Sequence, residues 1–100
     1  MIYQLKISPI ANIELLDSIE WYNTQKDKLG FEFLHEIENA FELIKKNPLL
    51  FAKIYKDFRM LLINRFPFEV FYSIEDNMIL IHHIFHSSRN PKIWKKKLDK

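Results

Sequence analysis

The sequence lacks cysteine altogether and contains one glycine and four prolines among its 100 residues. Without cysteine the chain can form neither disulfides nor thiolate metal sites, so its stability must come from packing. A hydrophobic content of 48% excludes a disordered chain. No apolar run approaches the roughly 18 residues that cross a bilayer, and no charged stretch leads into an apolar segment at the N-terminus. We therefore expect a cytoplasmic protein with no membrane partner, folded as one domain over residues 1–100.

Charge is distributed unevenly along the chain. Residues 1–44 carry three Lys and Arg against eight Asp and Glu, whereas residues 45–100 carry twelve against five. The net charge of +2 therefore combines −5 in the first part with +7 in the second. A basic half indicates an anionic partner, either nucleic acid or an acidic polypeptide, although small soluble domains also separate solvated charges without binding anything.

Hydrophobic periodicity predicts a strand and a helix at the start of the chain. IYQLKI alternates as a strand does, and Ser8-Pro9 is typical of a helix start with Ser8 as the N-cap. The helix is expected to fray near Thr24. Its inward positions are predicted to be Leu15, Leu16, Ile19 and Tyr22, and its outward positions Glu14, Asp17 and Glu20.

A second helix is predicted after the polar link QKDKLG. It should end before Asn47-Pro48, because the residue before a proline is pushed out of helical geometry. The inward stripe is predicted to be Phe33, Ile37, Ala40, Phe41 and Ile44, and the outward residues Glu32, Glu36, Glu38 and Glu42.

After the loop PLLFAKIYKD the hydrophobic period changes to two. FRMLLIN, FEVFYSI and MILIHHIFH read as three strands joined by hairpin turns at RFP and EDN, and Asn90-Pro91 is expected to open a short helix or turn. The order β-α-α-β-β-β predicts an α+β domain, with a helical hairpin packed on one face of a largely antiparallel four-stranded sheet.

Three histidines lie at the end of the last predicted strand. Residues four apart on one face of a strand stand about 13 Å apart, so His82 and His86 cannot share a metal. His83 is expected to be a partly buried structural residue. We assign no metal and no cofactor. His86, beside Ser87, Ser88 and Arg89, lies at a strand end, where exposed functional groups more often gather.

Basic and aromatic residues are expected to meet on the sheet face that the helices leave free. Arg59, Leu61, Ile63 and Arg65 alternate along one side of their strand. The basic residues expected to converge there are Lys53, Lys56, Arg59, Arg65, Arg89, Lys95, Lys96 and Lys97, with Tyr55, Phe58, Phe68 and Tyr72 between them. Such a surface suits single-stranded RNA or an acidic peptide, unless the aromatic residues belong to the core.

Five stretches resemble, in order and spacing, the RelE/ParE superfamily of bacterial toxins. They are EWYNTQKDKLGFEFLHEI, NPLLF, the arginine of FRMLL, RFPFEVFYSIED and HSSRNPKIW, and together they span nearly the whole chain. The resemblance implies a RelE/ParE-like fold with the same β-α-α-β-β-β order. It also implies a growth-inhibiting toxin of the plasmid-stabilisation type, held in a hetero-oligomer by a cognate antitoxin whose extended C-terminal segment wraps around it.

The resemblance implies one of two toxic actions. One branch poisons DNA gyrase through protein contacts, and the other cleaves mRNA on the ribosome, where Arg59 and His86 would act on the scissile phosphate. The cleaving branch usually carries a further arginine on the strand that here reads FEV, and Glu69 would oppose the developing negative charge. Gyrase is therefore the favoured target.

The binding residues expected from this interpretation are Lys53, Lys56, Arg65, Arg89, Trp94, Lys95 and Lys96. Two alternatives stay open. His86, Arg89, Lys53 and Lys56 would supply a different set of catalytic groups for a nuclease. A non-toxic adaptor that binds nucleic acid is the third class of protein compatible with the sequence.

Overall fold

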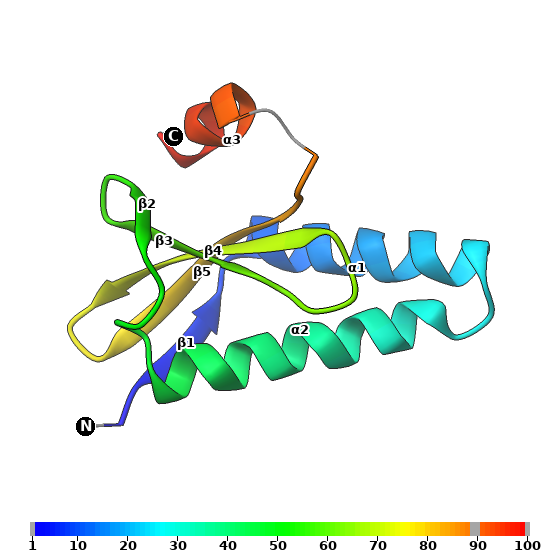
Figure 1. Cartoon of the computed structure of the whole chain (residues 1–100), viewed down its shortest axis with the longest axis horizontal. Coiled ribbons are helices and arrows are strands. Elements are labelled where there is room, and N and C mark those ends of the chain that lie inside the picture. Colours follow the sequence, from blue (N-terminus) through cyan, green and yellow to red (C-terminus); the bar gives the residue numbers. More distant parts are fainter. Residues whose placement is uncertain (1, 89–90, 100) are drawn as a thin grey trace.

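Two helices cover one face of a five-stranded sheet, and a third helix lies over the opposite face (Figure 1). This computed structural model describes residues 2–88 and 91–99. The chain order is β1 (Gln4–Ile7), α1 (Pro9–Gln25), α2 (Leu29–Lys46), β2 (Lys53–Tyr55), β3 (Phe58–Leu62), β4 (Phe68–Glu75), β5 (Met78–His86) and α3 (Pro91–Leu98). The architecture confirms the predicted α+β fold class.

The sheet has one strand more than the sequence predicted. Its order is β1-β5-β4-β3-β2, with β1 parallel to β5 and the other pairs antiparallel. The additional strand, β2, lies at the edge and contains three residues within the stretch predicted to be a loop. Three residues are too short for an alternating pattern to be recognised, which is why the periodicity gave four strands.

The start of α1 follows the prediction. The Ser8 hydroxyl oxygen accepts a hydrogen bond from the Ala11 amide at 3.0 Å, and Pro9 is the first helical residue. The Ser8 hydroxyl also donates to the His82 carbonyl at 3.0 Å. The N-cap therefore fixes α1 to β5 as well as starting the helix.

The single glycine of the chain lies where α2 meets α1. The Gly30 amide donates to the Asn23 side-chain oxygen at 2.7 Å, and a β-carbon at this position would overlap the Ile19 carbonyl oxygen. A larger residue would force the two helices apart. Glycine is therefore required here by the close approach of two backbones rather than by its conformational freedom.

The main core lies between the helical hairpin and the sheet. Fully buried Phe33, Ile37 and Ile44 of α2 confirm most of the predicted inward stripe, whereas Phe41 is only partly buried. In α1 the prediction for Leu16 is wrong, because its side chain is 56% exposed. Apolar residues occur on both sides of α1, so periodicity could not orient this helix.

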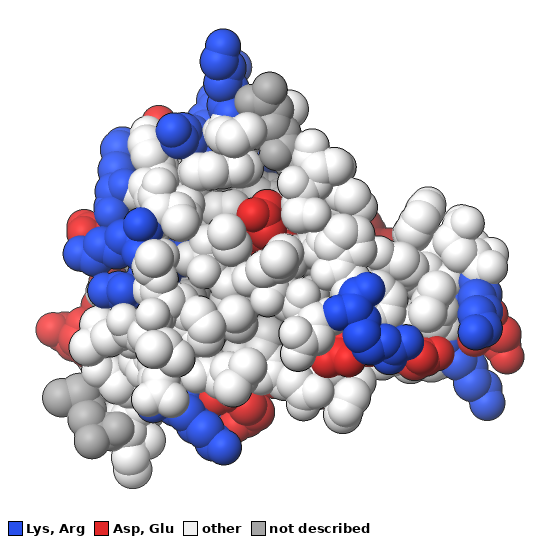
Figure 2. Space-filling view, in the orientation of Figure 1, with Lys and Arg blue, Asp and Glu red and all other residues white. Residues whose placement is uncertain are grey.

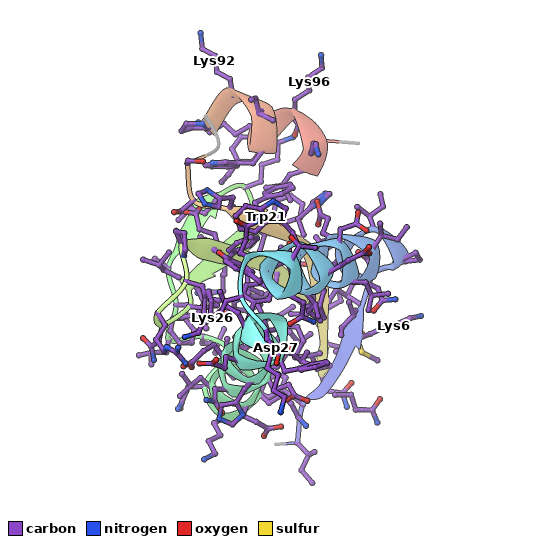
Figure 3. The ribbon with its side chains drawn as sticks, turned by 90° about the vertical axis from the view of Figure 1, so that its right-hand side faces the viewer. Lys6, Trp21, Lys26, Asp27, Lys92 and Lys96 are labelled. Carbon is purple, nitrogen blue, oxygen red and sulfur yellow. The ribbon has the colours of Figure 1, made fainter. Side chains whose placement is uncertain are left out.

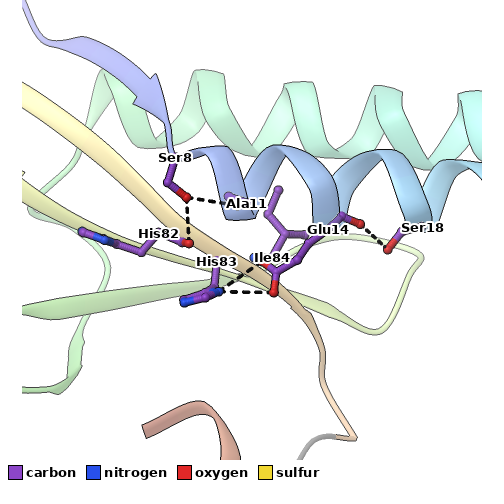
Figure 4. Close-up of polar contacts among 7 residues, drawn as sticks. All are labelled: Ser8, Ala11, Glu14, Ser18, His82, His83 and Ile84. Carbon is purple, nitrogen blue, oxygen red and sulfur yellow. Dashed lines mark hydrogen bonds and ion pairs between the residues drawn. The ribbon is translucent and has the colours of Figure 1, made fainter. Parts of the chain in front are cut away.

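Glu14 is a second correction to the orientation of α1. Its carboxylate turns inward and accepts the Ile84 amide of β5 at 2.9 Å (Figure 4). It also lies 3.2 Å from the Nδ1 atom of His83. β1 pairs with β5 only as far as Ile81, so Ser8 and Glu14 of the following segment close the part of the β5 edge that β1 leaves open.

A bulge in β5 changes the faces of its histidines. Phe71 pairs with His83, whereas the next residue, Tyr72, pairs two positions earlier in β5, so His82 is an additional residue between the two pairs. The bulge turns His82 toward Ser73 and Phe58 on the face of the sheet that α3 covers, whereas His86 contacts Phe68 of the main core on the face that α1 and α2 cover. The prediction that His82 and His86 share a face is therefore wrong.

His83 lies in a buried environment, as the sequence predicted. Its side chain is 7% exposed, and its ring stacks on Phe85 at a centroid distance of 4.5 Å. The contact with Glu14 satisfies Nδ1. Within the part of the chain that the structure describes, no helix is long and apolar enough to cross a bilayer.

Candidate binding surface

The second face of the sheet is partly covered by α3. The Trp94 ring packs against Phe71 at 5.1 Å and against Tyr55 at 6.1 Å, and Leu98 is buried beside them. Phe85 completes this small apolar cluster. The expectation of a free face is corrected accordingly: α3 places one apolar side on the sheet, and Lys92 and Lys96 are exposed on its other side.

A polar network joins α3 to the turn between β2 and β3. The Tyr55 hydroxyl donates to the Asp99 carboxylate at 2.8 Å, and the Lys56 ammonium contacts the same carboxylate at 2.6 Å. The hydrogen bond to Asp99 raises the pKa of Tyr55 and that of Lys56. The hydrogen bond from Lys56, and to a smaller extent the one from Tyr55, lowers the pKa of Asp99. Asp99 therefore stays ionised at neutral pH and orients both partners.

Lysines lie beside the two partly buried aromatic rings of this region, Tyr55 and Trp94. The ammonium of Lys56 lies 5.3 Å from the Tyr55 ring, and that of Lys95 lies 5.4 Å from the same ring and 5.7 Å from Trp94. We call this region the basic surface; it comprises Lys53, Tyr55, Lys56, Lys92, Trp94, Lys95 and Lys96. Figure 2 shows positive side chains gathered over α3 and the β2–β3 region, and in Figure 3 Lys92 and Lys96 extend away from the body of the molecule.

Arg65 lies away from the basic surface, and Arg59, although it lines a cleft with Lys53 and Lys56, directs its guanidinium to backbone carbonyls. Arg59 projects from the face of the sheet that α1 and α2 cover, where its guanidinium donates to the Phe51 carbonyl at 2.6 Å. Arg65 lies in the β3–β4 turn with φ of 70° and contacts Glu32 of α2 at 2.8 Å. The hydrogen bond with Glu32 raises the pKa of Arg65 and lowers that of Glu32. The expectation that both arginines face the same open surface is wrong.

Arg59 and Tyr72 together hold the loop after α2. Arg59 also donates to the Leu49 carbonyl at 3.3 Å, and the buried Tyr72 hydroxyl donates to the Pro48 carbonyl at 2.6 Å. Burial raises the pKa of Tyr72 to about 12. Phe68 and Tyr72 belong to the main core. For these two residues, the alternative that the aromatic side chains are part of the core is therefore confirmed.

His86 lies at the opposite end of the sheet from Arg59. It pairs with Phe68, whereas Arg59 pairs with Tyr72, which is opposite Ile81. About five residues along the strand direction and two strand spacings separate Arg59 from His86. The backbones of these two residues are therefore roughly 15 to 20 Å apart. Arg89, predicted to lie beside His86, is outside the described residues.

A cleft of about 530 Å³ opens beside the β2–β3 hairpin; its lining includes Lys53, Lys56, Phe58, Arg59, Ser73 and His82. The Nε2 atom of His82 lies 2.7 Å from the Ser73 hydroxyl, and the Phe58 ring meets the imidazole edge-on at 5.0 Å. Burial, and secondarily His83, lowers the pKa of His82, so this imidazole is neutral at pH 7. We call this the hairpin cleft.

Sequence reasoning placed Tyr55 among the basic residues but missed the roles of His82 and Asp99 at this end of the molecule. The face on which His82 lies is set by the bulge, and only the pairing of the strands reveals that bulge. Tyr55 and Asp99 are 44 residues apart and meet because α3 returns to the β2–β3 turn. Among residues 2–88 and 91–99, no three His, Asp or Glu side chains come together as metal ligands.

Comparisons with known proteins agree on the fold. A family model described as "ParE toxin of type II toxin-antitoxin system, parDE" matches residues 5–91. A solved structure titled "Chromosomal ParDE TA system from P. aeruginosa" superimposes with a TM-score of 0.76 at 17% sequence identity, covering 85% of this chain and 96% of that chain. No curated protein sequence matches the chain.

Proposed function

The chain belongs to the ParE toxins of type II toxin–antitoxin systems, and we propose that it arrests growth by binding DNA gyrase through the basic surface. Its other partner is the antitoxin of the pair. The observation that supports the gyrase proposal is the pairing of Tyr55 and Trp94 with Lys56 and Lys95 on a surface held in place by Asp99. Trp and Tyr are enriched among the residues that contribute most to the binding energy of protein interfaces.

The positions of the predicted nuclease residues also favour a non-hydrolytic action. A general acid or base must come within hydrogen-bond reach of the group on which it acts, and Arg59 and His86 lie at opposite ends of the sheet. Glu69, half-buried in β4, is the residue at the position where the cleaving branch would carry a cation. Burial raises its pKa, and no positive partner for its carboxylate occurs among the described residues.

A supercoiling assay tests the proposal. Purified toxin is expected to inhibit gyrase and to leave ribosome-bound mRNA whole. The double substitution Lys95→Glu and Lys96→Glu should raise the toxin concentration needed for inhibition by about tenfold or more, because it reverses the charge of the surface. The matched control is Lys6→Glu, an exposed lysine on β1 away from α3 (Figure 3), which should behave as wild type.

Two outcomes would contradict the gyrase proposal. One is normal supercoiling at every toxin concentration. The other is equal inhibition by the double variant and the wild type, which would move the contact away from α3.

A ribosome-dependent mRNA interferase is the second candidate, and the hairpin cleft is the observation that favours it. Beside the carboxylates of Asp57 and Glu75, the cleft contains two lysines, an arginine and the neutral imidazole of His82, which would provide cations for a phosphate and a base for a ribose hydroxyl. Primer extension on translating ribosomes separates the candidates. Codon-specific cuts that disappear with His82→Gln would establish cleavage through this cleft, whereas cuts that disappear with His86→Gln would place it at the other end of β5.

The toxin assignment has its own test in cells. Expression of the chain alone should arrest growth, and co-expression of the antitoxin should relieve the arrest. Growth that continues while soluble, folded protein accumulates would be incompatible with a toxin.

A further inference from the structure

A second cleft, of about 490 Å³, lies between α1 and the end of β5. It is lined by Asp17, Ser18, Trp21, Tyr22, Phe68, His86 and Ser88, and we call it the aromatic cleft. Trp21 is 57% exposed, whereas Tyr22 and Phe68 form the floor and are at least nine-tenths buried. Figure 3 shows Trp21 on α1.

The rings of the aromatic cleft form a continuous wall. Trp21 meets Tyr22 edge-on at 5.0 Å, Tyr22 lies 6.0 Å from Phe68, and Phe68 meets His86 edge-on at 5.3 Å. Aromatic surface of this kind attracts the methylene stem and the charged head of a cationic side chain. The volume is in the range of pockets that enclose a ligand group.

Three polar groups at the cleft have no hydrogen bond within the described residues: the Asp17 carboxylate, the Trp21 indole N–H and the Nε2 atom of His86. The Ser88 amide donates to Nδ1 of His86 at 3.1 Å, so the proton of the neutral ring is on Nε2. The cleft therefore offers one negative acceptor and two N–H donors. A carboxylate recognises a cation, and the two donors recognise backbone carbonyl oxygens.

Among the described residues, the charge of the cleft favours a cationic ligand. Asp17 contributes a negative charge, and the described lining residues include no Lys or Arg. Glu20 is an exposed carboxylate on the same helix, outside the lining of the cleft. A phosphate or an acidic side chain would be repelled here, in contrast to the basic surface.

We infer that the aromatic cleft binds an arginine side chain presented by the antitoxin. The guanidinium would pair with Asp17 and stack on the Trp21 ring, while the carbonyl groups beside it accept from Trp21 and His86. This inference rests on the toxin function proposed above for the identity of the partner. The ligand chemistry itself comes from the charge and the donors of the cleft.

The surface next to the cleft fits a peptide partner rather than a free cation. Ile10 and Ile13 are 57% and 58% exposed on α1, and with Trp21 they span about 16 Å along the helix axis. That length matches three turns of a partner helix or five residues of an extended segment. The apolar residues of such a segment would cover the isoleucines, and its arginine would enter the cleft.

A small probe tests the ligand chemistry. N-acetyl-arginine methylamide is titrated into the ¹⁵N-labelled toxin, and the two indole signals, assigned with Trp94→Phe, are followed by NMR. The Trp21 signal should shift with a dissociation constant on the order of millimolar, and Asp17→Asn should abolish the shift. The citrulline analogue, which has the same shape but no charge, should leave the signal in place. Equal responses to both compounds, or none, would refute the cation site.

The antitoxin complex tests the source of the arginine. Trp21→Ala should weaken antitoxin binding roughly thirtyfold and Asp17→Asn about tenfold, whereas Trp21→Phe should retain most of the affinity. Glu20→Gln, which removes an exposed carboxylate outside the cleft, is the matched control and should change affinity less than about twofold. Thermal unfolding of each variant establishes that the fold is retained.

The outcomes separate this inference from the gyrase proposal. Unchanged antitoxin affinity in Trp21→Ala and Asp17→Asn would overturn the inference. Loss of gyrase inhibition with intact antitoxin binding would assign the cleft to the target and would also overturn it. If the wild type fails to inhibit gyrase, the binding measurements still decide whether the antitoxin occupies the cleft.

Discussion

The two faces of the sheet differ in how much of the core they carry. Among the described residues, the cluster between the sheet and the helices α1 and α2 has fifteen buried members, whereas the cluster between the sheet and α3 has three, Phe71, Phe85 and Leu98. Burial of apolar area is the main source of stability, so the helical hairpin must supply most of the folding free energy. The smaller cluster is sufficient to seat α3, and this face is the one that carries the basic surface.

The basic surface lies on the face of the sheet that has the smaller core. The ion pair between Lys56 and Asp99 is exposed and contributes little to stability, yet it positions the residues proposed to meet a partner. The comparison indicates that stability and recognition are largely separated in this chain. Substitutions on the two faces should therefore have different consequences.

The largest expected effect is Phe33→Ala on the helix side. Phe33 is fully buried and its ring contacts Phe66 and Phe68 at 5.3 and 4.8 Å, so its removal should lower the free energy of unfolding by about 3 to 5 kcal/mol. Urea unfolding midpoints measure this loss. Phe31→Ala on the same helix removes a side chain that is 61% exposed and should change stability by less than about 0.5 kcal/mol. Similar losses in both variants would mean that α2 is rotated.

Glu14→Ala should have the next largest effect. The substitution leaves the Ile84 amide without its acceptor and removes the contact with His83, which should cost about 1 to 3 kcal/mol. Glu14→Gln keeps an oxygen that can accept from the amide and should lose less. Hydrogen exchange at the Ile84 amide reports the same contact directly, and unchanged protection in Glu14→Ala would show that another group accepts this hydrogen bond.

Trp94→Ala tests the smaller cluster under α3. Because Trp94 is partly exposed and its cluster is small, we expect a loss of about 1 to 2 kcal/mol in global stability. The amides of α3 should exchange much faster than those of α2. A loss as large as that of Phe33→Ala would mean that the two faces fold as one equal core.

The smallest expected effect is the pH dependence that His82 contributes. Burial lowers its pKa below 6.5, so below that pH the unfolded chain binds a proton that the folded chain resists. This contribution to stability is complete above pH 6.5 and is lost as the pH falls toward the folded pKa. The groups that act on the ring are Ser73, His83 and Glu75. His82→Gln should therefore reduce the difference between urea midpoints at about pH 7.5 and about pH 5; an unchanged difference would assign it to other groups.

The periodic parts of the chain were predictable from the sequence. The stretch MILIHHIFH corresponds to β5 from Met78 to His86, and Ser8-Pro9 marks the start of α1. These elements have strong local signals, because alternation and N-capping are set by neighbouring residues. The fold class follows from their order.

The candidate sites depend on pairing that the sequence does not encode locally. One additional residue in β5 changes the face of His82, and the inward turn of Glu14 is compensated by an amide 70 residues away. Arg65 appeared to continue an alternating strand, but the strand ends at Leu62 and the arginine lies in a turn. Each error concerns a side chain whose direction is set by a distant partner rather than by its neighbours.

The closure of the β5 edge by Ser8 and Glu14 determines where another chain can extend the sheet. A strand added beside residues 82–86 would have to displace a carboxylate that already occupies the Ile84 amide and a hydroxyl that already donates to the His82 carbonyl. Exposed backbone pairing sites invite strand addition, and these are occupied from within the chain. Among the described strands, β1 and β2 form the outer edges of the sheet. An antitoxin segment that binds as a strand must therefore pair with one of these two, and it leaves the end of β5 to contacts made by side chains.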